Sequence, residues 1–139
     1  MINRGSVAVY DRNFVVDNVK DRYDFYRLNN CTFLQSYITQ LARIRQPKEV
    51  KFAEAGEAVV GGSDHGVVYI FGARTGIQLD VLHHGKAMMV QTIAVCLWMP
   101  STEPSKLICS QTVDIREGNI IAVGASAGDL RHPTISLWK

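Results

Sequence analysis

The sequence predicts an all-β fold built from many short strands, and three observations support that prediction. Short runs of β-branched and aromatic residues recur along the chain, glycine-rich turns separate them, and parts of the pattern repeat. Short strands with regular turn signals are typical of sandwiches, barrels and propellers. With 47% hydrophobic and 20% charged residues, the 139-residue chain has the composition of one globular domain.

The first strands of the chain are predicted from runs of β-branched and aromatic residues. The segment after them permits two interpretations. Apolar residues at helical spacing would make residues 32–45 an amphipathic helix, capped by Thr32 and stopped by Pro47. The internal repeat instead makes residues 32–38 a strand, and we adopt the strand. The strands predicted in this third of the chain are 6–10, 13–19, 23–26 and 32–38.

The rest of the chain continues the same pattern of strands and turns. Gly56 and Gly66 mark tight turns, because glycine adopts the positive φ that such turns often require. Pro104 marks a loop. The strands predicted here are 50–53, 58–61, 67–71, 77–82, 88–97, 107–113, 119–123 and 134–138.

An internal repeat relates three parts of the chain. Residues 60–63 (VGGS) and 123–126 (VGAS) each follow an apolar run and lead through a turn into a strand that ends on an aromatic residue. A weaker third copy ends at Tyr26, which lies 45 residues before Phe71. A period of about 40–45 residues is that of a propeller blade. Because Trp138 follows Phe71 by 67 residues, the last copy is expected to carry an insertion.

These units resemble the WD-repeat β-propeller family, most closely over residues 49–82 and at the ending Ile135-Ser136-Leu137-Trp138-Lys139. The resemblance implies a single partial β-propeller domain over residues 1–139, with antiparallel four-stranded blades. The expected blades are 1–38, 39–84 and 85–139, with the insertion around 98–118. Since a propeller needs at least about four blades, we expect the C-terminal part of a longer propeller, or a chain that self-associates to complete a ring.

The repeats depart from the family at its buried hydrogen-bond network. Gly61, His65 and Phe71 stand where the resemblance calls for serine, aspartate and tryptophan. We therefore expect packing, rather than a polar network, to hold these blades together.

No catalytic, cofactor or metal site is predicted. Asp64-His65 fits turn chemistry before Gly66, and His83-His84 lacks further ligands nearby. The three cysteines, Cys31, Cys96 and Cys109, have no metal-site or redox-motif spacing and are expected to be buried free thiols.

The charge balance limits the classes of partner. A net charge of +2 and a pI near 8.5 are too mild for nucleic acid binding, and no apolar run is long enough to span a membrane. The densest basic stretch, which we expect to be a solvated loop, alternatively marks a site for an anionic partner. Its residues are Arg43, Arg45, Lys48 and Lys51.

The resemblance implies a non-catalytic protein-interaction scaffold inside the cell, cytoplasmic or nuclear, with a protein partner of unknown identity. Specificity is expected in loops on a rigid frame, and Trp98 is either a core anchor or an exposed contact. Two other functions stay open: a truncated propeller fragment without independent function, and a small all-β hydrolase using a histidine with Asp64. The candidate loops are 63–66, 85–88, 101–105 and 128–133.

Overall fold

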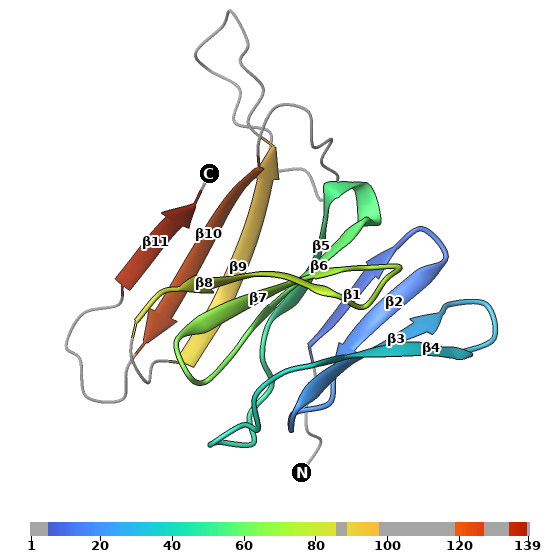
Figure 1. Cartoon of the computed structure of the whole chain (residues 1–139), viewed down its shortest axis with the longest axis horizontal. Helices are drawn as coiled ribbons and strands as arrows, with labels where there is room; N and C mark the ends of the chain where they lie inside the picture. The colour runs from blue at the N-terminus through green and yellow to red at the C-terminus, as the bar shows by residue number, and fades with distance from the viewer. Residues whose placement is uncertain (1–5, 86–88, 98–118, 127–133, 139) are drawn as a thin grey trace, which may run out of the picture.

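Three antiparallel sheets make up the part of the chain that the computed structural model describes, which is residues 6–85, 89–97, 119–126 and 134–138 (Figure 1). All regular structure in these residues is strand, apart from one short 3-10 turn. The all-β prediction is thus confirmed over the described residues. The strand predicted at 107–113, the insertion at 98–118 and Trp98 lie outside them.

The first sheet is a meander in which each strand pairs with the next along the chain. Residues 33–38 form its last strand, so the strand interpretation is confirmed and the helix alternative is wrong. The turn before this strand carries Cys31, which is exposed rather than buried as expected. The strands are β1 (Val7–Tyr10), β2 (Asn13–Asp17), β3 (Arg22–Arg27) and β4 (Phe33–Ile38).

The second sheet repeats the four-stranded meander, with a 3-10 turn η1 (Glu54–Gly56) between its first two strands. Gly61 lies directly against the ring of Tyr23 from the first sheet, where a Cβ atom would collide with the ring. Glycine, in place of the serine of the family pattern, therefore allows the first and second sheets to pack closely at position 61. The strands are β5 (Val50–Ala53), β6 (Ala58–Gly62), β7 (Val67–Gly72) and β8 (Gln78–His83).

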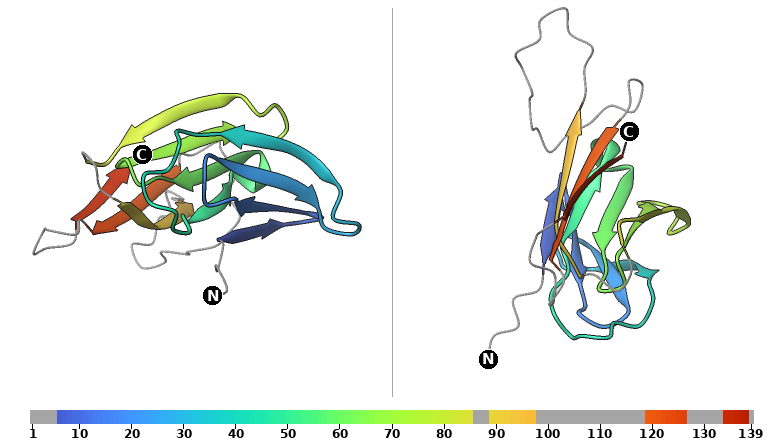
Figure 2. Two further views of the ribbon diagram at one scale, coloured as in Figure 1. Left: turned by 90° about the horizontal axis from the view of Figure 1, so that it is seen from below. Right: turned by 90° about the vertical axis from the view of Figure 1, so that its left-hand side faces the viewer.

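The third sheet contains three strands within the described residues, in the spatial order β11-β10-β9. They are β9 (Met89–Leu97), β10 (Asn119–Ser126) and β11 (Thr134–Trp138). The second sheet contacts both of the others, through β1 and β5 on one side and through β6 and β9 on the other; Figure 2 gives two further views of the sheets. The first strands of neighbouring sheets lie side by side, since β1 contacts β5 and β5 contacts β9.

The 45-residue repeat appears in the strand pairing of the first two sheets. The β3–β4 ladder has a bulge between Phe25 and Tyr26, and the β7–β8 ladder has one between Ile70 and Phe71. Each bulge lies at the same register position, 45 residues apart. Because a bulge changes which face later side chains reach, the shared position shows that the two sheets are copies of one unit.

Two apolar cores lie between the sheets. The first is rich in aromatic rings: Tyr37 packs on Phe71 with ring centroids 5.3 Å apart, and Tyr23 meets Phe71 edge-on at 6.4 Å. The second core, between the second and third sheets, is aliphatic and includes Val60, Val68 and Val90. Each sheet is therefore fixed to the next through one buried face.

Candidate interaction surface

The segment that joins the first sheet to the second, residues 39–49, is called the linker below. Its backbone is tied to the β2–β3 turn of the first sheet: Thr39 donates its N–H to the carbonyl of Asp21 at 2.8 Å, and Ala42 donates to that of Lys20 at 2.7 Å. The linker thus has a defined path, although it contains no helix or strand.

Asp64, in the β6–β7 turn, holds the linker from the second sheet. The residue is 5% exposed, and its carboxylate oxygen Oδ2 accepts hydrogen bonds from the backbone N–H groups of Arg43 and Ile44, the latter at 2.7 Å. Oδ1 lies 2.8 Å from Nδ1 of His65. Hydrogen bonds to a carboxylate are stronger than neutral ones, so Asp64 fixes the middle of the linker to the next sheet.

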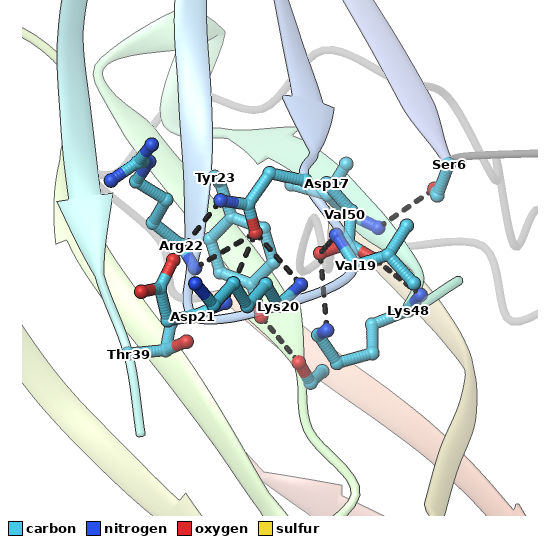
Figure 3. A network of polar contacts seen from close by, with 12 residues as sticks. Ser6, Asp17, Val19, Lys20, Asp21, Arg22, Tyr23, Thr39, Lys48 and Val50 are labelled. Carbon is cyan, nitrogen blue, oxygen red and sulfur yellow. Dashed lines mark hydrogen bonds and ion pairs between the residues drawn. The ribbon is translucent and has the colours of Figure 1, made fainter. Parts of the chain in front are cut away.

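A second buried acid holds the end of the linker (Figure 3). Asp17 accepts a hydrogen bond from the backbone N–H of Lys48 at 2.7 Å, and its other oxygen lies 3.2 Å from the Lys48 ammonium. Asp17 also accepts the backbone N–H of Val19 at 3.1 Å. Both Asp17 and Lys48 are 2% exposed. The expectation of a solvated loop is therefore wrong at Lys48, because an ion pair is buried there.

Tyr23 extends this polar group toward the second sheet. Its hydroxyl donates a hydrogen bond to the carbonyl of Gly62. Burial raises the pKa of Tyr23 well above its usual value, and the negative charge of Asp17 adds to the rise. Tyr23 therefore stays a neutral donor at physiological pH. Packing alone does not join these sheets, contrary to the expectation from the sequence: Asp17, Tyr23 and Asp64 supply polar contacts of a different kind.

The anchored linker displays apolar and cationic side chains to solvent. Leu41 is 63% exposed and Ile44 53% exposed, and the intervening Arg43 and the following Arg45 are also exposed. These four residues are called the linker surface. What sets Leu41 and Ile44 apart from the other exposed apolar side chains is their position beside exposed arginines on a backbone that buried carboxylates hold.

An open groove of about 440 Å³ begins where the linker leaves β4. Tyr69, Val67 and Val81 of the second sheet give it an apolar lining, and the hydroxyl of Tyr69 accepts a hydrogen bond from the Gln40 N–H at 3.4 Å. We call it the rim groove. It is lined by Ile38, Thr39, Gln40, Val67, Tyr69, Gln78, Val81 and His83.

The chain resembles many solved structures, of which three illustrate the likeness. The computationally designed Ika4 protein has a TM-score of 0.57 and 17% identity, with 96% of this chain and 63% of that chain covered. A chain of a mitotic checkpoint complex has a TM-score of 0.56 and 10% identity, with 87% of this chain and 31% of that chain covered. Sqt1 of Saccharomyces cerevisiae has a TM-score of 0.58 and 14% identity, with 85% of this chain and 27% of that chain covered. All three are WD-repeat propellers.

The fold is that of a partial WD-repeat β-propeller. The four-stranded sheets resemble propeller blades, and the chain spans less than two thirds of the length of each of these three structures. No protein-family model and no curated protein matches the chain.

The predicted partner loops of the propeller are only partly described. Residues 63–66 form the β6–β7 turn, whose Gly66 carbonyl accepts hydrogen bonds from the N–H groups of His84 and Gly85. Residues 86–88, 101–105 and 128–133 lie outside the described residues. The linker is not among the loops predicted to bind a partner, although its basic stretch was the alternative site for an anionic partner.

Of the residues weighed for catalysis, Asp64 and His65 lie together, but the Asp64 carboxylate is buried and bonded to the linker backbone. Within the residues that the structure describes, no group of three or more His, Cys, Asp or Glu could hold a metal ion. No helix in the same residues is long and apolar enough to cross a membrane.

Proposed function

We propose that this propeller is a non-catalytic protein-interaction scaffold that binds a partner protein through the linker surface and the rim groove. The observation that supports the proposal most is the exposure of Leu41 and Ile44 on a backbone that two buried carboxylates hold in place. Apolar side chains presented on a pre-organised segment lose little conformational entropy when a partner covers them.

The setting of this scaffold is proposed to be inside the cell, in the cytoplasm or the nucleus. An exposed free thiol at Cys31 suits a reducing compartment. One of the similar structures is a mitotic checkpoint complex, which is consistent with a propeller that works within an assembly.

Site-specific photo-crosslinking in cells tests the scaffold proposal. A photoreactive amino acid is placed at Leu41 or, as a control, at Leu28, which is 48% exposed in the β3–β4 turn. We expect discrete protein adducts from position 41 that position 28 does not form. If both positions give the same adducts, or neither gives any, the linker surface is not a protein-binding site.

The outer face of the first sheet favours a second function, self-association. Phe14 stacks on Tyr26 with ring centroids 5.2 Å apart, Tyr26 meets Phe33 at 5.7 Å, and Val7 and Val9 are exposed on the same face. In the second sheet, the positions 45 residues after Phe14 and Tyr26 are Val59 and Phe71. Both are buried against the first sheet.

The outer face of the first sheet is therefore exposed, whereas the corresponding face of the second sheet forms an interface with the first sheet. We propose that a second copy of the chain covers it, which would extend the array of blades toward a ring. A head-to-tail contact of this kind closes into a ring when its rotation permits.

A further inference from the structure

We propose that the linker surface and the rim groove bind an extended, acidic peptide segment with apolar residues between its carboxylates. This inference rests on the protein-binding role proposed above and adds the chemistry of the partner. It concerns the side chains of Leu41, Arg43, Ile44 and Arg45 together with the groove beside them.

Apolar contact is the first requirement that the partner must meet. Leu41 and Ile44 expose most of their surface, and Val67, Tyr69 and Val81 line the groove on the second-sheet side. Apolar side chains that enter such a groove would bury surface on both molecules, which favours association. Nucleic acid, whose outer surface is phosphate, would leave Leu41 and Ile44 without apolar partners.

The charges around the linker indicate which charge the partner should carry. Within the described residues, neither Arg43 nor Arg45 makes an ion pair, nor does the exposed Lys20, whose carbonyl accepts the linker N–H of Ala42. Of the nearby carboxylates, Asp17 is paired with Lys48, whereas Asp64 and Asp21 accept hydrogen bonds from neutral groups and keep their negative charge. The three exposed cations outnumber these two carboxylates, so the net charge at the linker is positive and a negatively charged segment complements it.

The shape of the site favours an extended segment. β8 is the last strand of the second sheet, so one of its edges has no neighbour in that sheet. Val81 and His83 alternate along β8 and line the groove. A peptide that lies beside an edge strand can pair with its backbone while alternate side chains enter the groove.

Fluorescence anisotropy with defined peptides and the full chain tests the inference. The first probe alternates glutamate with leucine, the second alternates lysine with leucine, and the third alternates glutamate with serine. A labelled single-stranded RNA is the fourth. We expect the glutamate–leucine probe to bind at least about tenfold more tightly than the others, and its affinity to fall as salt is raised, because salt screens exposed charges.

Variants of the chain locate the binding. Leu41→Ser with Ile44→Ser, and separately Arg43→Glu with Arg45→Glu, are each expected to weaken the glutamate–leucine probe at least about tenfold. The matched control is Val7→Ser with Val9→Ser, which removes two similarly exposed side chains from β1, away from the linker surface and the rim groove, and should leave binding unchanged. Circular dichroism of each variant verifies that the strands are retained.

The outcomes separate this inference from the broader proposal. If the lysine–leucine probe binds equally well and Leu41→Ser with Ile44→Ser abolishes it, the linker surface binds protein but the acidic partner is wrong. If RNA binds most tightly, both the inference and the protein-binding role at this surface are overturned. If the glutamate–leucine probe binds but the linker variants do not weaken it, the assigned site is wrong.

Discussion

At the scale of single residues, Asp17 and Lys48 form an ion pair that is almost fully removed from water. Burying two charges costs a large desolvation energy, which good geometry and further hydrogen bonds offset. Asp17 has those bonds, from the backbone N–H groups of Lys48 and Val19. Breaking the pair from one side leaves a lone charge in the interior.

Asp17→Ala should therefore lower the free energy of unfolding by about 3–5 kcal/mol, because the Lys48 ammonium is left buried without its partner. Adding Lys48→Met should restore much of the loss, since no buried charge remains. Urea unfolding of the single and double variants measures both. The control is Glu57→Ala at the exposed Arg74–Glu57 pair, where the change should stay within about 1 kcal/mol. A double variant no more stable than Asp17→Ala would contradict this account.

Tyr37 should make the fold sensitive to alkali. Burial raises its pKa to about 12, against an opposing hydrogen bond from Gln35, while its unperturbed value is 10.0. A raised pKa means that the folded state holds the proton more tightly. The stability from this group is therefore complete below pH 10 and is lost as the pH rises from 10 to about 12.

Urea unfolding at a series of pH values measures this effect. We expect the free energy of unfolding to decline between pH 10 and about 12, and to decline less steeply in Tyr37→Phe, which has no proton to lose. An equally steep decline in Tyr37→Phe would show that other groups cause it.

At the scale of elements, the linker is held more firmly than its lack of helix or strand suggests. Its middle depends on the two backbone hydrogen bonds to Asp64. A charged acceptor contributes about 1.5–3 kcal/mol per bond. Removing the carboxylate should loosen the linker without unfolding the sheets on either side.

In Asp64→Ala we expect the amides of Arg43 and Ile44 to exchange with solvent at least about tenfold faster, while amides in β3 and β7 keep their protection. Hydrogen exchange followed by NMR resolves these positions. Asp80→Ala is the control, because Asp80 accepts a hydrogen bond from Val81 of its own strand rather than from the linker. Unchanged exchange at Arg43 and Ile44 would mean that other contacts hold the linker.

The strands could be predicted from the sequence, and the contacts of the linker could not. Alternation and turn residues mark strands locally, and the repeat decided residues 33–38, where helical spacing favoured the wrong structure. The burial of Lys48 depends on Asp17, 31 positions earlier, and that of Asp64 depends on backbone groups about 20 positions away. No local pattern records such partners, so the basic stretch looked uniformly solvated.

At the scale of the whole molecule, the uncovered face of the first sheet should make the chain associate. The repeat places an interface on the corresponding face of the second sheet, and exposed apolar strand faces of this kind promote assembly.

Light scattering after size-exclusion chromatography should show a mass that rises with concentration toward a discrete oligomer. Phe33→Glu should shift the chain toward monomer, because it introduces a charge beside the Phe14–Tyr26 stack. Leu79→Glu, at a similarly exposed position on β8, should not. A monomer at all concentrations, or an oligomer that Phe33→Glu leaves intact, would contradict self-association.

The attachment of the linker to both blades has a thermodynamic consequence for any ligand. Asp17 joins its end to the first blade and Asp64 its middle to the second, so the peptide that would bind Leu41 and Ile44 also bridges two rigid bodies. If the ligand binds more tightly when the two sheets are docked, then its binding must stabilise the docked sheets by the same free energy, since such coupling is reciprocal. Loss of the partner would therefore weaken the contact between the first and second sheets.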